Sequence, residues 1–167
     1  MAPKPLKIQE TSLQEALVDL VDLALQGKQA HWNIHGRHFR SVHLHLDEII
    51  AEARLAADEV AERLATVGGT PDARAATVAK SSGLDELEAG PLPADEVVRL
   101  FEERLMTASE RIKGHLDDLE EKDHLSADLL IGVATKLEKQ AWMLRASAED
   151  VAAPAAAAGG AKSRKSA

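Results

Sequence analysis

The chain has 167 residues, a length that suits one domain with a sizeable core. It contains no cysteine, which excludes disulfides, thiolate metal sites and cysteine nucleophiles, and its aromatic content of 2% requires a core of aliphatic side chains, which favours helices over a sheet. The formal net charge is −8: residues 11–160 carry about −12, whereas residues 1–10 carry +1 and residues 162–167 carry +3.

Neither end of the chain has the pattern of a targeting or membrane segment. The beginning, MAPKPLKIQE, lacks the apolar run of a secretory signal. The stretch VAAPAAAAGG near the other end is too short and too weakly apolar to span a membrane, and Pro and Gly interrupt it. We therefore expect a cytoplasmic protein without a membrane partner.

Two long helices are expected in the first half of the chain. The first begins at TSLQE, where Ser12 and Glu15 fit a capping box, and continues to the region of Gly36. The second extends from about Phe39 to Val67 and ends at a pair of glycines. The tight turn between them predicts an antiparallel helical hairpin.

A long connection, with a short helix expected in ARAATVAKSS, leads to a second pair of helices. The third helix is expected from about Ala94 to Glu120, and the fourth from about Ser126 to a point before Pro154. This layout predicts an all-α four-helix bundle. The expected boundaries are 1–10 for a mobile N-terminal extension, 11–150 for the bundle, and 151–167 for a flexible Ala- and Gly-rich tail with a basic end.

Histidines are concentrated in the stretch HWNIHGRHFRSVHLHLDE, residues 31–48, which closes with two carboxylates. One interpretation is a polar turn between two helices. The other is a metal site, which without cysteine would have to use histidine and carboxylate ligands. The pair His31 and His35 has the spacing of helical zinc ligands, but a zinc protease would need Glu where this chain has Trp32. We therefore exclude a zinc-protease site.

The second helix presents two different faces on a helical wheel. One is a narrow apolar stripe, and the other, about 140° away, holds two pairs of potential metal ligands. The two pairs lie eleven residues apart, roughly 16 Å along the axis, so one ion cannot contact both within one chain. The alternative is a solvated charged face with salt bridges to Arg54. The pairs are His43 with Asp47, and Asp58 with Glu62.

A second copy of the chain would bring the two pairs together. Two such helices laid antiparallel about residues 52–53 place the second pair of one subunit beside the first pair of the other, in two equivalent sites. His31 faces His43 across the hairpin, since both are equidistant from a turn near residue 37. The expected site joins two imidazoles to three carboxylates, a set suited to iron. Its members are His31, His43 and Asp47 of one subunit, with Asp58 and Glu62 of the other.

These segments resemble the Dps family, the mini-ferritins named as DNA-binding proteins from starved cells. The similarity covers roughly residues 10–148 and includes DLLIGVATKLEKQAWML, which is similar to the family's last helix. The resemblance implies a ferritin-like bundle that assembles through two-fold dimers into a hollow dodecamer. The most specific motifs are H-W-N-x-x-G (31–36), F-x-x-x-H-x-x-x-D (39–47) and D-x-x-A-E-R-x (58–64).

The resemblance also implies an activity. Members of the family oxidise Fe²⁺, typically with hydrogen peroxide, at sites between subunits, store the ferric product as mineral, and thereby protect DNA from oxidative damage. The five residues of the expected site match the iron ligands of the family, and zinc could substitute for iron there. Trp32 matches a family tryptophan beside the site, and His35 is a further residue that could assist with the metal.

The resemblance also suggests roles for other acidic residues, which the residue pattern alone does not indicate. Mini-ferritins have acidic three-fold pores for iron entry, and the junction of the last two helices has suitable residues, although helix capping and solvation would explain them equally well. Glu48 and Glu52 lie toward the expected cavity and could nucleate mineral. The pore candidates are Asp118, Glu121, Asp123 and Asp128.

Some family members bind DNA through lysine-rich tails. Here the ends of the chain offer few cations and the body is acidic, so DNA binding would be weak and salt-sensitive unless twelve tails act together. An alternative function is therefore a nucleoid-associated, DNA-compacting protein with a weak metal site, and a further one is a structural bundle without iron uptake. The candidate DNA-binding residues are Lys4, Lys7, Lys162, Arg164 and Lys165.

Overall fold

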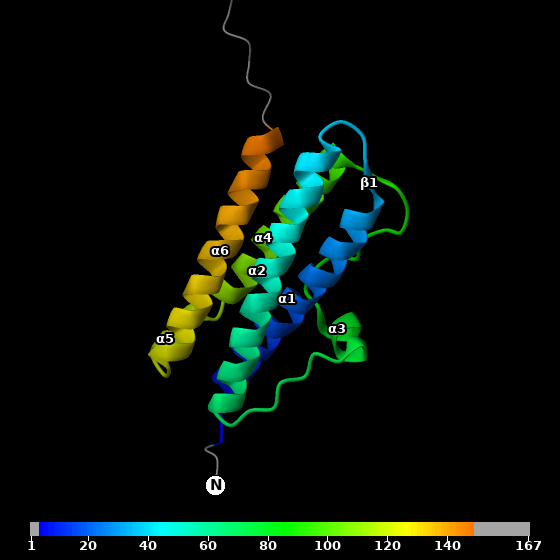
Figure 1. Cartoon of the computed structure of the whole chain (residues 1–167). Coiled ribbons are helices and arrows are strands. Elements are labelled where there is room, and N and C mark those ends of the chain that lie inside the picture. The colour runs from blue at the N-terminus through cyan, green and yellow to red at the C-terminus, as the bar shows by residue number, and fades with distance from the viewer. Residues whose placement is uncertain (1–3, 149–167) are drawn as a thin grey trace, which may run out of the picture.

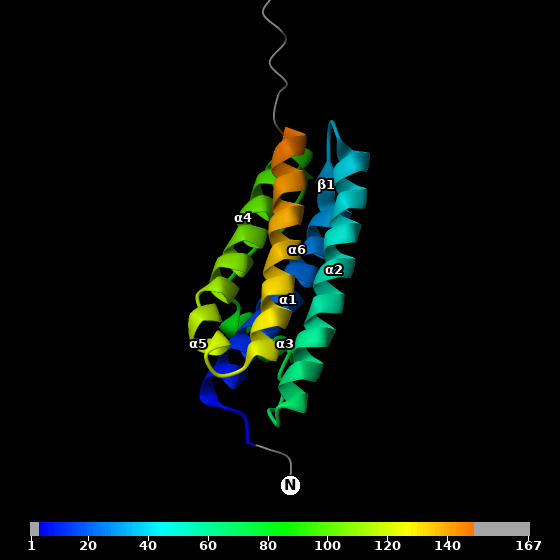
Figure 2. The same ribbon diagram turned by 90° about the vertical axis from the view of Figure 1, so that its left-hand side faces the viewer.

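Four long helices run along the bundle in two antiparallel pairs (Figures 1 and 2). The computed structural model describes residues 4–148. The connection after the second long helix returns along the whole bundle, so the second and third long helices point the same way, as in bundles with one long crossover (Figure 1). The most extensive contacts lie within each pair, α1 with α2 and α4 with α6. The bounds are α1 (Lys7–Asn33), α2 (Phe39–Thr66), α4 (Ala94–Lys113) and α6 (His124–Ala148).

Short elements complete the connections between the long helices. The expected short helix is present as α3 (Ala75–Ser81), and α5 (Leu116–Glu120) precedes α6. Two strands of two residues, β1 (Ile34–His35) and β2 (Leu92–Pro93), pair in parallel with Ile34 opposite Leu92. This pairing attaches the end of the long connection to the turn between α1 and α2.

The core is aliphatic, as the composition requires. Leu13, Leu23, Leu46 and Leu64 are 0% exposed, and Phe101 is the one buried aromatic side chain among residues 4–148. The apolar stripe predicted for α2 is buried along nearly its whole length. Among the helices that the structure describes, none combines the length and the apolar character that crossing a membrane would need.

The start of α1 differs from the prediction. The helix begins at Lys7, and the Leu6 backbone N–H donates to Oε1 of Gln9 at 2.7 Å. Ser12 lies inside the helix, where its buried hydroxyl donates to the carbonyl of Ile8 at 2.7 Å. The predicted cap at Ser12 is therefore wrong, and residues 7–10, assigned above to the N-terminal extension, belong to α1.

The third predicted helix is divided in two. α4 ends at Lys113, and a turn at Gly114 and His115 separates it from α5. Glycine weakens a helix interior, and the His115 ring reaches Glu15 of α1, with 3.0 Å between Nε2 and Oε2. The break is therefore set by a contact across the bundle.

Buried polar side chains hold the long connection in place. The guanidinium of Arg104, a residue only 4% exposed, donates to Oε1 of Gln26 at 2.7 Å and to the carbonyls of Asp85 and Glu86 at 3.0 and 3.3 Å. Asp19 of α1 accepts the backbone N–H of Gly83 at 2.8 Å. These contacts fasten the connection to both α1 and α4.

The close approach of α1 to α2 can be tested at Gly27. A Cβ there would lie 2.7 Å from Cγ1 of Ile50, so Gly27→Val should overpack the hairpin and lower stability by about 1–3 kcal/mol. At Gly132, in α6, a Cβ would meet nothing within 4 Å, and Gly132→Ala should stabilise by about 0.5–1 kcal/mol. Thermal unfolding followed by circular dichroism measures both. Equal melting temperatures of the two variants would contradict this packing.

Candidate metal centre

Three potential ligands converge where α1 ends and α2 begins. His31 lies in the last turn of α1, while His43 and Asp47 lie one turn apart near the start of α2. One ligand atom from each of them falls within 4.8 Å of the others. The His31 side chain is 10% exposed and that of Asp47 is 45% exposed. The cluster is therefore anchored in the hairpin and open on one side.

The turn between α1 and α2 sets which residues face each other. Gly36 and His38 have φ values of +99° and +65°, in the left-handed region that reverses the chain in few residues. The Phe39 backbone N–H then donates to the carbonyl of Gly36 at 3.2 Å, and α2 begins. This geometry places position 43 opposite position 31, as the sequence predicts.

The two imidazoles hold each other in one orientation. Nδ1 of His31 lies 3.1 Å from the carbonyl oxygen of His43, and Nδ1 of His43 lies 3.1 Å from that of His31. The rings stack with their centroids 3.6 Å apart. Because a carbonyl only accepts, each Nδ1 carries the proton, and in the neutral rings Nε2 keeps its lone pair for a metal. Backbone contacts of this kind orient the histidine ligands of metal sites.

Lys28 is a member of the cluster that the sequence analysis did not find. Its Nζ lies 2.5 Å from Oδ1 of Asp47, which is also 3.4 Å from Nδ1 of His31. The hydrogen bond from Lys28 holds the pKa of Asp47 below its ordinary value, against the opposing effect of burial. The hairpin register could have revealed Lys28, because position 28 lies opposite positions 46 and 47. A metal cation at Oδ1 of Asp47 would compete with this ammonium group, whereas Oδ2 has no hydrogen-bond or ion-pair partner among residues 4–148.

Asp58 and Glu62 lie apart from this cluster, farther along α2. Both are exposed, and within residues 4–148 neither carboxylate makes a hydrogen bond or an ion pair. Asp58 lines a groove of about 320 Å³ between α1 and α2, together with Arg54 and Leu25. The two carboxylates are therefore available to a neighbouring molecule.

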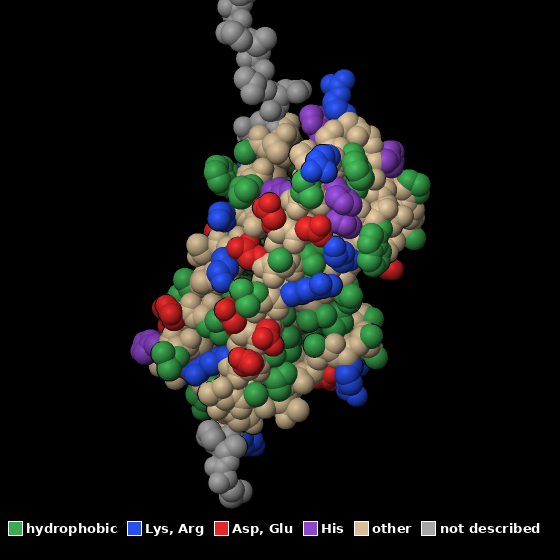
Figure 3. Space-filling view, in the orientation of Figure 1, with side chains coloured by type: hydrophobic (Ala, Val, Ile, Leu, Met, Phe, Trp, Pro, Cys, Tyr) green, Lys and Arg blue, Asp and Glu red, His purple; other side chains and the backbone are tan. Residues whose placement is uncertain are grey.

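Apolar side chains share this face of the hairpin. Leu25, Leu44 and Leu55 are 56%, 44% and 55% exposed. Figure 3 shows histidines grouped at the end of this face near the α1–α2 turn, with hydrophobic side chains farther down between charged ones. Exposed apolar side chains gathered on one face suit contact with a second protein surface, in which the carboxylates would need a cationic partner.

Comparisons with known proteins identify the family. The family model of the ferritin-like domain matches residues 10–153. DNA protection during starvation protein 2 of Deinococcus radiodurans is 37% identical over 84% of this chain, which spans 58% of that protein. The DNA protection during starvation protein of Mycolicibacterium smegmatis is 34% identical over 82% of this chain and 75% of its own length. The chain belongs to the Dps family.

Solved Dps structures share the fold. A Dps protein of Deinococcus radiodurans superposes with a TM-score of 0.82 at 36% identity, covering 84% of this chain and 85% of its own. The Dps of Mycobacterium smegmatis gives a TM-score of 0.81 at 32% identity, covering 86% and 87%. The predicted ferritin-like four-helix bundle, with a short helix in its long connection, is thus confirmed.

Other predicted residues of this Dps-family chain lie around the cluster. Trp32 follows His31 in α1 and is 71% exposed, whereas His35 is exposed in β1 and does not belong to the cluster. Glu48 is exposed on α2, and Glu52 accepts the amide of Gln140 in α6 at 2.6 Å. Lys4 and Lys7 are exposed. Lys162, Arg164 and Lys165 lie outside the described residues.

The four pore candidates differ from one another. Asp118, Glu121 and Asp128 are exposed. Asp123 is instead used inside the chain, because its nearly buried carboxylate accepts Arg63 at 2.8 Å, Gln9 at 2.7 Å and Ser126. Burial would raise the pKa of Asp123, but these hydrogen bonds outweigh burial and hold that pKa well below its ordinary value. This residue connects α1, α2 and α6, and the other three are the ones exposed for a pore.

The internal role of Asp123 predicts a pH-dependent stability. Its pKa is lower in the folded chain than in the unfolded chain, so its contribution is present above the unfolded value of about 3.9 and is lost as the pH falls below it. Asp123→Asn should cost about 1–3 kcal/mol at neutral pH and progressively less below pH ~4. Urea unfolding at several pH values measures this, with exposed Asp118→Asn as the control. A cost that does not depend on pH would contradict the assignment.

The contact with Lys28 predicts a change at Asp47. Lys28→Met keeps the aliphatic stem and removes the ammonium, so the pKa of Asp47 should rise toward its ordinary value. A titration of side-chain carboxyl resonances by NMR measures the shift. Lys139→Met, which removes an exposed charge on α6, serves as the control. An unchanged Asp47 titration in Lys28→Met would show that the ion pair does not form in solution.

Proposed function

We propose that this protein is an iron-storing ferroxidase whose metal site is completed by a second copy of the chain. The observation that supports this most strongly is that the candidate ligands form two groups at different places along α2, with His31 of α1 added to the first. His31, His43 and Asp47 form an oriented cluster, whereas the exposed carboxylates of Asp58 and Glu62 lie unpaired on the same helix. One straight helix keeps these groups roughly 16 Å apart, so the full set needs two subunits.

A two-fold axis near the middle of α2 would bring the groups together. Each chain would then receive the partner's carboxylates at its own cluster and offer its carboxylates in return, which makes two equivalent sites per dimer. The exposed Leu44 and Leu55 would be covered in the same contact. We propose that six such dimers close into a hollow dodecameric shell in the cytoplasm, with room for mineral inside.

The ligand set suits Fe²⁺ as the substrate. Two imidazole Nε2 atoms and carboxylate oxygens form the mixed nitrogen and oxygen environment that iron accepts. The carboxylates neutralise the charge of the cation, and they favour the ferric product more than the ferrous substrate because that product carries the higher charge. Before iron binds, the ammonium of Lys28 balances the charge of Asp47 through Oδ1. Zinc fits the same donors and would occupy the site without redox chemistry.

Hydrogen peroxide is the proposed oxidant. Two Fe²⁺ ions give one electron each to one hydrogen peroxide molecule, whose oxygen–oxygen bond breaks. Hydrolysis of the two Fe³⁺ ions to ferric oxyhydroxide then releases protons to the solvent. Since the reaction consumes both ferrous iron and peroxide, it removes the two reagents that generate hydroxyl radicals. Protection of DNA would follow without any contact between this protein and DNA.

Complementation between two inactive variants tests the shared site. One chain carries His31→Gln and Asp47→Asn, and the other carries Asp58→Asn and Glu62→Gln. Each variant alone should oxidise Fe²⁺ slowly after anaerobic loading and addition of hydrogen peroxide. Co-assembled in equal amounts, they should recover about a quarter of the wild-type rate, because half of the randomly formed dimers contain one intact site out of two. Ferric absorbance and the iron content of the particle are measured.

The control variant Asp95→Asn/Glu96→Gln removes two exposed carboxylates from α4 and should behave as wild type. All proteins are first shown to assemble alike by size-exclusion chromatography. Wild-type rates in the Asp58→Asn/Glu62→Gln protein would contradict the ferroxidase assignment. Loss of activity in both variants without recovery on mixing would contradict the sharing of ligands between subunits.

A further inference from the structure

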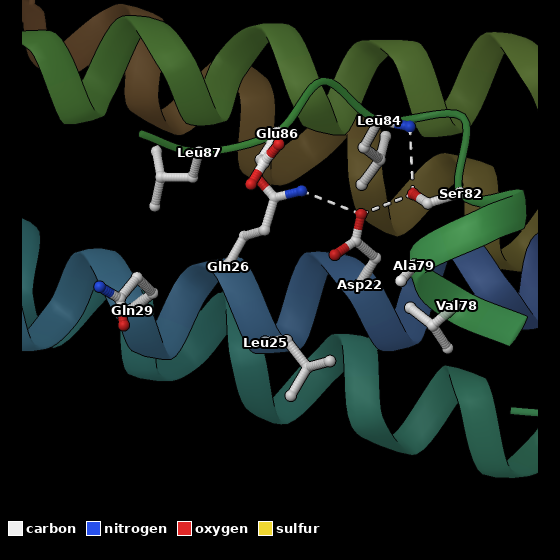
Figure 4. A pocket seen from close by; sticks show the side chains of 10 residues that line it. All are labelled: Asp22, Leu25, Gln26, Gln29, Val78, Ala79, Ser82, Leu84, Glu86 and Leu87. Carbon is white, nitrogen blue, oxygen red and sulfur yellow. Dashed lines mark hydrogen bonds between the residues drawn. The ribbon is translucent and has the colours of Figure 1, made fainter. Parts of the chain in front are cut away.

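Another cavity, of about 420 Å³, lies between α1 and the long connection; it shares Leu25 with the groove at Asp58 but is lined by none of the candidate metal ligands. Figure 4 shows Asp22 and Gln26 of α1 pointing toward the segment after α3, with Leu84, Glu86 and Leu87 of that segment facing α1, whereas Leu25 lies on the other side of α1. This volume lies in the range of ordinary small-molecule sites. The cavity plays no part in the function proposed above.

Hydrogen bonds fix the polar centre of the cavity. Gln26 accepts from Arg104 through Oε1 at 2.7 Å, and its Nε2 donates to Oδ2 of Asp22 at 2.9 Å. The hydroxyl of Ser82 donates to the same Oδ2 at 2.5 Å (Figure 4). Both bonds use one oxygen of Asp22, so Oδ1 has no hydrogen-bond partner among residues 4–148. The carboxylate is therefore held in position with one oxygen left for a ligand.

The same arginine holds the segment after α3. Arg104 donates to the carbonyls of Asp85 and Glu86, which places the side chain of Glu86 at the cavity. Its donors are thus used by backbone and amide oxygens, and it forms no ion pair with a carboxylate within the part of the chain that the structure describes. The buried side chain of Arg104 therefore holds both sides of the cavity in place before any ligand binds.

The side chains that line the cavity carry a negative charge, which the guanidinium of Arg104 behind Gln26 offsets only in part. Asp22 and Glu86 line it, and neither forms an ion pair with a cation among residues 4–148. No Lys, Arg or His is among the residues that line it. An anionic ligand would therefore be repelled, and a cationic one would find two carboxylates without having to displace a bound charge.

The walls are apolar at both ends. Leu87 lies at one end, and Leu84 and Val78 lie at the other (Figure 4). A hydrated metal ion would gain nothing from such walls. The only group of three or more metal-ligating side chains in the described chain is the one at His31. The walls instead suit the methylene groups of an organic cation.

We propose that this cavity binds a small linear alkylamine with two or more ammonium groups, the chemical class of the polyamines. One ammonium would bind Oδ1 of Asp22 and another would lie near Glu86. The methylene chain between them would pack against Leu84, and the amide of Gln29 would accept a further N–H at the rim. The ammonium groups of such a ligand would match the carboxylates of the cavity, and its methylene groups would match the apolar walls.

Calorimetric titration of the assembled particle with spermidine tests the proposal. We expect saturable binding of one molecule per chain that persists at about 0.15 M salt, where long-range attraction to an acidic surface is screened. Asp22→Asn/Glu86→Gln should weaken the affinity about tenfold or more, because two charge-assisted contacts are lost. Ala79→Leu, which fills the cavity without changing any charge, should also abolish binding.

Asp95→Asn/Glu96→Gln removes the same amount of charge elsewhere and should keep wild-type affinity. Equal affinity of all four proteins for spermidine would show that the ligand binds through general attraction to the acidic surface, and it would overturn the proposal. Absence of saturable binding to wild type would overturn it as well. A failure of Asp22→Asn/Glu86→Gln to assemble, with Ala79→Leu still binding spermidine, would show that the cavity is a contact between subunits.

Discussion

The length of α2 between its two groups of candidate ligands is the constraint on which the proposed function of this chain depends. A helix is a stiff rod, and eleven residues along it keep Asp47 and Asp58 roughly 16 Å apart. No rearrangement of side chains closes that distance, so one chain by itself cannot bring both groups of candidate ligands to one ion. In the proposed ferroxidase, assembly and chemistry are thereby coupled, because a subunit without its partner lacks the complete set of ligands.

The hairpin of α1 and α2 is the second constraint, because it orients the two histidines. Its left-handed turn brings His31 and His43 together, and each ring bonds the other residue's backbone carbonyl. The carbonyl of His31 lies in the last turn of α1, where helices leave acceptors unsatisfied. His43 therefore completes the end of one helix while it presents a metal ligand from another, and the ligand geometry depends on the packing of the hairpin.

Hydrophobic periodicity alone was sufficient to predict the features that depend on a single local pattern. The four long helices, the aliphatic core and the facing of the two histidines all follow from helical spacing and the position of one turn. Two local signals compete at the start of α1: Ser12 matches a helix start, yet α1 begins at Lys7, where Gln9 caps it. Contacts between distant elements decided other features. The use of Asp123 inside the bundle depends on three helices at once, which no local pattern contains.

The scarcity of aromatic residues has an optical consequence. The chain has no tyrosine and two tryptophans, so almost all of its ultraviolet fluorescence comes from Trp32 and Trp142. Trp32 follows a candidate iron ligand directly, and Trp142 lies on α6, a different helix from those that hold the cluster. Iron quenches indole emission at short range, so loss of the Trp32 emission on loading would report the arrival of iron at the proposed site. The proposed function thus comes with a reporter of site occupancy that needs no added label.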